Sequence, residues 1–300
     1  MKDYVSTTVS VHANLIIQFD YYSASFAGRR KNNQDSCLGL KPSKNSIFLA
    51  VADGMGGVAG GEVASNLVIE SARRVLKDRF SAEIWPEDLK SILKEIFSAA
   101  QTDISNKIKE KPELTGMGTT LTCVLILDGK FVWGNMGDSR VYLYSDSEIK
   151  QLSIDHTQIQ EYIDKIGPDI PERLVENHGH FLTRAINGGN YEPDIFPESE
   201  PYKLFNSGEA FLLCSDGLIL NKSDQLNQNL TDYLIGTKKL KDAAENLISY
   251  AYNEGSNDNI TVVLCSNGKL ERQRIKLKKY GYPPGEEKKN GLSFFKKWIS

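Results

Sequence analysis

The sequence predicts an α+β fold in which stacked, mainly antiparallel sheets are flanked by helices. Three observations lead to this prediction. Short apolar segments with strand character occur near both ends and in the middle of the chain, the helical patterns gather in two blocks, and strands and helices do not alternate regularly. Regular alternation would instead favour a doubly wound parallel sheet.

The first half of the chain predicts strands followed by two helices. Residues 15–26 are rich in aromatic and β-branched side chains, and 47–52 form a continuous apolar run typical of a strand buried on both faces. Apolar residues then recur at helical spacing over 62–80. A second helix, 86–109, opens with proline, which is favoured in a first turn. Residues 1–13 are polar, and we expect a flexible N-terminus there.

The second half predicts a meander of strands, a long loop, and closing elements. The meander strands are expected at 119–127, 131–135, 140–144 and 148–152, with an Asp-Gly turn joining the first two. Residues 155–190 are irregular except for a short helix near 158–166, and indicate a surface loop or lid. A strand at 210–214, a helix at 242–252 and a strand at 260–265 complete the prediction.

Charge and cysteine usage narrow the class of protein. The formal net charge is -3, but residues 269–300 carry +7 and the preceding body -10. An acidic body does not suggest nucleic acid as the main partner. The four cysteines show no metal-type spacing, and we find neither a secretory signal pattern nor a run of 18 apolar residues. We therefore expect buried free thiols and a cytoplasmic protein.

Short acidic segments next to the predicted strands suggest a metal site. They are Asn33-Gln34-Asp35, Asp53-Gly54-Met55-Gly56-Gly57, Gly137-Asp138-Ser139-Arg140, Ser215-Asp216-Gly217 and Asn257-Asp258-Asn259. A single Asp-Gly pair usually marks a turn. Carboxylates gathered at one rim of a sheet, however, repel one another unless a counter-charge is present. Oxygen ligands suit Mg²⁺ or Mn²⁺, so the pattern predicts a multi-metal hydrolytic site.

Six motifs follow one another in a characteristic order. They are Arg30-Lys31-Asn32-Asn33-Gln34-Asp35, Val51-Ala52-Asp53-Gly54-Met55-Gly56-Gly57, Gly118-Thr119-Thr120, Gly134-Asn135-Met136-Gly137-Asp138-Ser139-Arg140, Ser215-Asp216-Gly217 and Asp258-Asn259-Ile260-Thr261. In this order they resemble the metal-dependent type 2C Ser/Thr protein phosphatases, especially the bacterial branch. The resemblance covers roughly residues 20–266. It implies an αββα sandwich of two antiparallel sheets, with the metals in a cleft at one end.

The resemblance also implies roles for individual residues. Asp53 would bridge two Mn²⁺ or Mg²⁺ ions, with the Gly54 carbonyl as a further ligand. Asp216 and Asp258 would complete the shell of the first ion. Asp138, together with Asp216, would hold the third ion seen in bacterial members. The aspartates would thus share the ions among them.

Other motif residues would act beside the ligands. Arg30 stands four residues before Gln34, the spacing that the family uses for its substrate-phosphate arginine, and a guanidinium binds two phosphate oxygens in fork geometry. The adjacent Arg29 is displaced from that spacing by one residue. Asp35 would orient metal-bound waters, with Gln34 and Asn259 also just outside the ligands.

Two positions depart from the pattern of many animal members. Gln34 replaces a glutamate, so one charged ligand is lost, as is common in bacterial members. Met55 replaces a histidine proposed as general acid, and a thioether cannot donate a proton. The pair His178 and His180 could suggest zinc, but two ligands in a loop favour an ordinary surface segment.

The resemblance therefore implies a metal-dependent enzyme that hydrolyses phosphoserine and phosphothreonine in proteins and opposes a Ser/Thr kinase. We expect a monomer with a catalytic domain over 14–267 and a flap within 155–190. The basic, aromatic tail over 268–300 could contact an anionic membrane, a partner or the acidic body. Two alternatives stay open: a non-catalytic phosphoprotein-binding regulator, and a metal phosphohydrolase of small phosphomonoesters.

Overall fold

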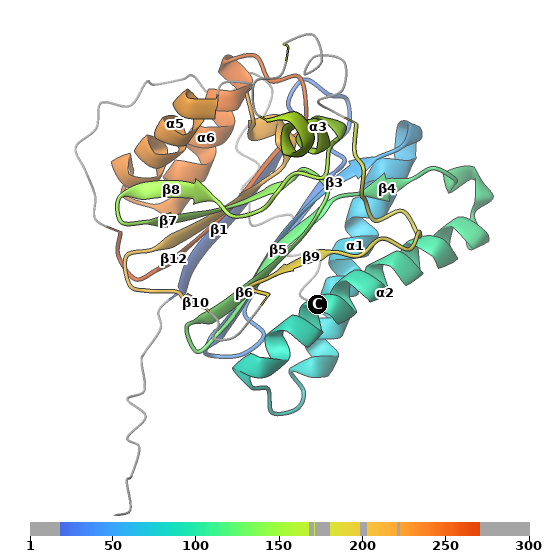
Figure 1. Cartoon of the computed structure of the whole chain (residues 1–300), viewed down its shortest axis with the longest axis horizontal. Coiled ribbons are helices and arrows are strands. Elements are labelled where there is room, and N and C mark those ends of the chain that lie inside the picture. The colour runs from blue at the N-terminus through green and yellow to red at the C-terminus, as the bar shows by residue number, and fades with distance from the viewer. Residues whose placement is uncertain (1–18, 168–170, 172–180, 199–202, 221–222, 271–300) are drawn as a thin grey trace, which may run out of the picture.

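Two antiparallel sheets pack face to face, and helices cover the outer face of each, as the computed structural model shows (Figure 1). The structure describes residues 19–167, 171, 181–198, 203–220 and 223–270. The expected N-terminus, 1–13, and nearly all of the expected tail, 268–300, lie outside these residues. The predicted α+β class and αββα order of layers are confirmed.

Each sheet is built from strands that are distant in sequence. The first sheet has the order β1 (Phe19–Phe26), β12 (Ile260–Asn267), β11 (Ala210–Cys214), β7 (Arg140–Ser145) and β8 (Glu148–Gln151). The second has the order β10 (Lys203–Leu204), β6 (Lys130–Met136), β5 (Leu121–Leu127), β3 (Ser46–Met55) and β2 (Asp35–Leu40). In addition, β4 (Gly118–Thr119) pairs with the end of β3, and β9 (Asp194–Phe196) pairs with β6.

Alternation along β3 explains why both of its faces are covered. Ile47, Leu49 and Val51 belong to the core between the sheets, where Phe211 of β11 also lies. The residues that alternate with them, at positions 48, 50 and 52, belong to the core between this sheet and the helices that cover it. Because successive side chains of a strand point to opposite faces, one continuous apolar run supplies both cores.

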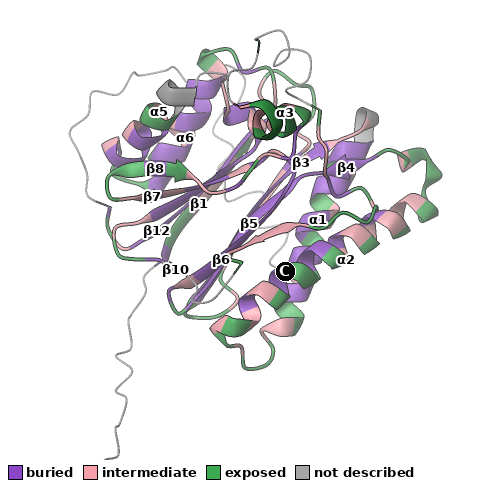
Figure 2. Ribbon diagram, in the orientation of Figure 1, coloured by how far each residue is buried: buried purple, intermediate pink, exposed green. Residues whose placement is uncertain are grey.

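The helices complete the outer layers. Helices α1 (Gly57–Arg79) and α2 (Leu89–Glu110) cover the second sheet, while α5 (Ser223–Gly236) and α6 (Leu240–Asn253) cover the first. Figure 2 shows α2 buried along the face toward its sheet and exposed on the other, as amphipathic spacing predicts. The short helix α3 (Gln158–Ile166) lies in the predicted loop. No helix in the described part of the chain combines the length and hydropathy that a membrane crossing requires.

Some predictions about individual elements were wrong. Helix α1 begins at Gly57, five residues earlier than expected, and the strands β2, β9 and β10 and the helix α5 were not predicted. Asp53 lies inside β3 instead of beyond its end, because pairing with β4 extends the strand to Met55. Asp35 begins a strand and does not follow one. Both aspartates are nevertheless at the same end of the sheet, because β2 and β3 are antiparallel and Asp35 is directly opposite Asp53.

The packing between the sheets makes a prediction about stability. The fully buried ring of Phe211 has its centroid 4.9 Å from that of Phe131 and 4.8 Å from that of Phe205. We expect Phe211→Ala to lower the free energy of unfolding by about 3–5 kcal/mol, because it removes buried area and leaves a cavity. Urea denaturation followed by circular dichroism measures this loss. Ile154→Ala, at a side chain 50% exposed, is the control, and comparable losses in both variants would contradict the account.

Candidate functional site

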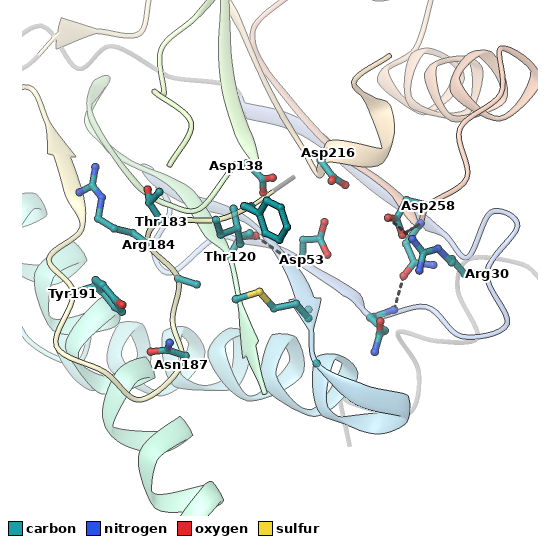
Figure 3. Close-up of a pocket in the computed structure, with 18 residues that line it drawn as sticks. Arg30, Asp53, Thr120, Asp138, Thr183, Arg184, Asn187, Tyr191, Asp216 and Asp258 are labelled. Atoms are coloured by element: carbon teal, nitrogen blue, oxygen red, sulfur yellow. Dashed lines mark hydrogen bonds and ion pairs between the residues drawn. The ribbon is translucent and has the colours of Figure 1, made fainter. Parts of the chain in front are cut away.

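Aspartates from separate elements gather at one end of the two sheets (Figure 3). Asp53, Asp138, Asp216 and Asp258 line a cavity of about 510 Å³, and Asp35 is buried beside Asp53. The antiparallel order brings them together. Strand β3 and the β6–β7 connection supply one member each, while the end of β11 and the start of β12 are adjacent and supply the other two.

The backbone around Asp53 is held by the Gly118-Thr119-Thr120 motif. The Asp53 amide donates to Thr120 Oγ1 at 2.8 Å, and its carbonyl accepts from Thr119 Oγ1 at 2.8 Å and from the Thr120 amide at 2.9 Å. Gly54 is required by close approach, since a Cβ there would lie 2.1 Å from the Gly61 carbonyl oxygen. The Asp53-Gly54 segment is therefore fixed in place before any ligand binds.

Asp35 is held by two hydroxyl groups. Its Oδ2 accepts from Ser215 Oγ at 2.8 Å and from Thr261 Oγ1 at 2.6 Å, whereas its buried Oδ1 has no hydrogen-bond partner. Burial raises the pKa of the Asp35 carboxyl to about 6, against the opposing effect of these two hydrogen bonds. One oxygen is thus anchored and the other is left available.

Three of the aspartates that line the cavity, Asp53, Asp138 and Asp216, also have raised pKa values. None of these three residues is completely buried. Desolvation of the carboxyl group is nevertheless the largest cause of the raised pKa in each of them. The pKa of Asp138 is raised to about 8, with the charges of Asp216 and Asp155 adding to desolvation. The pKa of Asp53 is raised well above its usual value, with the charge of Asp35 adding most after desolvation.

These features fit divalent cations. The carboxylates repel one another, and the buried oxygens Asp35 Oδ1 and Asp216 Oδ1 lack partners. Within the described residues, no group of three Asp, Glu, His or Cys side chains is placed so that these side chains alone could hold a metal ion. An ion would therefore need further ligands, such as the Gly54 carbonyl and water, and Mg²⁺ in particular retains several waters when protein-bound.

Arg30 lies on the rim of the same cavity. Its Nη2 is 2.9 Å from Asp258 Oδ2, and its Nε donates to the Asn257 carbonyl at 2.9 Å. The adjacent Arg29 does not line the cavity. It lies over the Tyr252 ring, 4.2 Å from the centroid, and donates to a backbone carbonyl. The structure thus separates the two arginines as their spacing suggested.

Asn259 ties the loop that carries Arg30 to the start of β12. Its Oδ1 accepts from the Gln34 amide at 2.8 Å, and its Nδ2 donates to the carbonyls of Ala27 and Asn32, each at 2.9 Å. Gly28 allows the loop to approach the start of β12 this closely. It has φ +65°, and a Cβ there would lie 2.2 Å from the Asp258 carbonyl oxygen. Asn259 therefore positions the loop and also lines the cavity.

The remaining predictions have mixed outcomes. Gln34 and Met55 line the cavity. His178 and His180 lie outside the described residues, so the structure does not address a zinc site there. None of the cavity-lining residues in the second half of the predicted loop, 155–190, or just beyond it was predicted as a site residue; they are Phe181, Leu182, Thr183, Arg184, Ala185 and Asn187 in the loop and Tyr191 beyond it.

The hydroxyl groups that hold Asp35 were also missed as functional residues, although a signal was present. Ser215 stands two residues after Leu213, and Thr261 two residues before Val263. Both apolar residues belong to the core between the sheets. Period-two alternation therefore directs the two hydroxyls into the same interior, at its polar end.

The raised pKa values predict how pH affects the metal-free protein. An unfolded aspartate ionises near pH ~3.9. The Asp138 contribution to stability is therefore complete below that pH and is lost as pH rises through about 8. In EDTA, we expect the stability of the wild type relative to Asp138→Asn to decrease between pH 5 and 9, measured by urea unfolding. A pH-independent or increasing difference would contradict the assignment.

Comparisons with known proteins agree with this geometry. The profile of the Protein phosphatase 2C family matches residues 24–265. The serine/threonine protein phosphatase PstP of Mycobacterium tuberculosis is 34% identical over 240 residues, which cover 79% of this chain but 42% of that protein. The serine/threonine phosphatase stp of Listeria welshimeri is 30% identical over 251 residues, covering 82% of this chain and 94% of that protein.

Solved structures agree as well. The catalytic domain of PstP in complex with two manganese ions superposes with a TM-score of 0.70 at 32% identity, covering 84% of this chain and 99% of that one. The match to the family profile extends from β1 to β12 and includes every aspartate of the site. The chain belongs to the protein phosphatase 2C family.

Proposed function

We propose that the chain is a metal-dependent protein Ser/Thr phosphatase that hydrolyses phosphoserine and phosphothreonine. The observation that carries the proposal is a single cavity that combines four aspartates with Arg30 at its rim. Carboxylates suit divalent cations, and a guanidinium suits a phosphoryl group. The names of the relatives and the manganese ions of the PstP catalytic domain support the proposal.

The cavity offers defined positions for cations. We assign Asp53 as the carboxylate that two Mn²⁺ or Mg²⁺ ions would share, the Gly54 carbonyl as a further ligand, and Asp216 and Asp258 as ligands of the first ion. We assign Asp138, with Asp216, to a third. When bound, such ions neutralise the carboxylates and supply a water-derived nucleophile near neutral pH.

The other side chains bind and orient. Arg30 can exchange its contact with Asp258 for two oxygens of a substrate phosphate, because both of its hydrogen bonds are exposed to solvent. Asp35 orients a water through its unpartnered Oδ1 while Ser215 and Thr261 hold Oδ2. Met55 cannot protonate the leaving group, so the proton must come from water or another donor. None of the described lining residues is Cys or His, which favours direct attack by water over a phosphorylated enzyme.

The setting of this activity is also a proposal. The family match over 24–265 supports a catalytic domain over 14–267, with the tail over 268–300 outside it. Buried free cysteines support a reducing, cytoplasmic location. Phosphorylated proteins would be the substrates, with a Ser/Thr kinase acting in opposition. The presence of Asp53, Asp216 and Asp258 together in one cavity disfavours a non-catalytic regulator.

Substitution of Asp53 tests the proposed chemistry. We expect Asp53→Asn to lower kcat on a phosphothreonine peptide by about 10³-fold or more, because a charged ligand is replaced by a neutral one. Its circular dichroism spectrum should match the wild type. Asp146→Asn, in an exposed turn, is the matched control, and full activity is expected there. Near-normal turnover by Asp53→Asn would contradict the proposal.

Removal of metal tests the same site without mutation. Chelation with EDTA should abolish hydrolysis, and added Mn²⁺ should restore it. Rates on phosphoserine, phosphothreonine and phosphotyrosine peptides, measured beside rates on small phosphorylated metabolites, separate a protein phosphatase from a small-molecule phosphohydrolase. Higher kcat/KM on the metabolites would favour the second class.

Arg30 provides a test of phosphate recognition. We expect Arg30→Lys to lower kcat/KM about 10- to 100-fold, because a charged, bidentate contact is worth about 1.5–3 kcal/mol. Steady-state kinetics with a phosphopeptide measure this change. Lys31→Ala removes an exposed cation from the same loop without touching the cavity, and should leave kcat/KM unchanged. Similar losses in both variants would indicate a non-specific charge effect.

A further inference from the structure

Asp155 and His156, which are adjacent in sequence, contact residues on either side of Asp138. Asp155 accepts from Arg140, two residues after Asp138, with Arg140 Nη2 at 2.7 Å and Nε at 3.0 Å from the carboxylate oxygens. His156 contacts Gly137, the residue immediately before Asp138. Two consecutive residues, Asp155 and His156, therefore hold the β6–β7 connection on both sides of Asp138.

The peptide groups of Gly137 are fully engaged. The Gly137 amide donates to His156 Nδ1 at 3.1 Å, and its carbonyl accepts from the His156 amide at 3.0 Å and from Asn135 Nδ2 at 3.1 Å. Gly137 has φ +110°, and a Cβ there would lie 2.5 Å from Thr120 Cγ2. The backbone at this point is thus specified by a side chain, His156, and by a conformation that only glycine adopts readily.

The contacts of His156 determine its tautomer. The side chain is almost completely buried, and Nδ1 must be unprotonated because it accepts from Gly137. Nε2 therefore carries the hydrogen and donates it to Asp194 Oδ2, 3.0 Å away in β9. Because one ring nitrogen accepts and the other donates, the imidazole can link the β6–β7 connection to β9 in one orientation only.

Asp194 extends the connection to the cavity wall. It accepts from Arg184 Nη1 at 2.7 Å, and although burial opposes this, the hydrogen bonds from Arg184 and His156 hold the pKa of Asp194 below its usual value. Arg184 and Thr183 both line the cavity, and the Thr183 amide donates to the His156 carbonyl at 2.8 Å. Figure 3 places Thr183 and Arg184 on the Asp138 side of the cavity, with Arg30 on the opposite side.

We infer that His156 is a positioning residue that fixes Asp138 through Gly137. Through Asp194 and Arg184, it also couples the β6–β7 connection to the segment 181–187, which contributes to the cavity lining. The inference rests on the proposed function only in assigning a cation to Asp138. The hydrogen bonds of His156 run to Gly137, Asp194 and Thr183. Since none of them runs to Thr119 or Thr120, which hold Asp53, the direct effect falls on the Asp138 part of the site. Loss of His156 should therefore weaken the Asp138 cation and spare those at Asp53.

A pair of substitutions separates the two halves of the imidazole. In His156→Asn, the side-chain oxygen can take the place of Nδ1 and accept from Gly137, whereas contact with Asp194 is lost. In His156→Gln, the longer amide can still donate to Asp194, but the acceptor for Gly137 is lost. We expect the Gln variant to be the more severely affected at Asp138, and the Asn variant to be partly rescued.

Two measurements on the full chain follow the effect. Hydrogen exchange of the metal-free protein, monitored by mass spectrometry, should be at least about 10-fold faster over 134–140 in His156→Gln, and unchanged over 47–55. Mn²⁺ titration followed by electron paramagnetic resonance should show one class of site, the class that Asp138→Asn also affects, weakened about 10- to 100-fold, the scale for losing a residue that orients a ligand, with the other sites unchanged. Asp138→Asn should reproduce the Mn²⁺ result without the local change in exchange.

The outcomes distinguish this inference from the proposed function. Faster hydrogen exchange over both 134–140 and 47–55 would indicate a general structural role for His156 and would overturn the inference. Unchanged hydrogen exchange and unchanged Mn²⁺ affinity in His156→Gln, when the wild type is active, would also overturn it. A wild type that hydrolyses no phosphopeptide would refute the proposed function instead. The local exchange difference between the Gln and Asn variants would still support the positioning of Asp138 by His156.

Discussion

Repulsion among carboxylates that are largely removed from water is the constraint on which the end of this sandwich depends. Asp35 and Asp53 face each other across two strands, and Asp138, Asp216 and Asp258 share the same cavity. In a medium that screens charge poorly, such a group raises its pKa values or acquires a counter-charge. The raised pKa values of the metal-free chain show the first response, and divalent cations provide the second.

The fold supports this unfavourable cluster with rigid packing. Apolar residues fill the space between the sheets up to its last polar layer, where hydroxyls of Ser215 and Thr261 hold Asp35. Close approaches of the backbone bring the ligand-bearing segments together, as at Gly217, where a Cβ would lie 1.8 Å from the Asn259 carbonyl oxygen. The cluster is therefore built before a cation arrives, and much of the cost of assembling it is met by folding.

The sequence predicted the parts of the protein whose signals are local. Continuous apolar runs gave β3, β11 and β12, helical spacing gave α1 and α2, and the ordered motifs predicted the aspartates and Arg30 that now line one cavity. Strand β2 was missed because its sequence is mixed and it begins with the functional Asp35. The role of His156 was not predictable, because its partners Gly137 and Asp194 are 19 and 38 residues away in the chain and meet it only in the folded state.

Anomalous diffraction from crystals soaked in Mn²⁺ tests the central claim most directly, because it locates the ions without reference to activity. The account predicts anomalous peaks within coordination distance of the Asp53 carboxylate and the Gly54 carbonyl, with Asp216 and Asp258 beside them and Arg30 released from Asp258. Absence of peaks at Asp53 in crystals grown at neutral pH with saturating Mn²⁺ would contradict it.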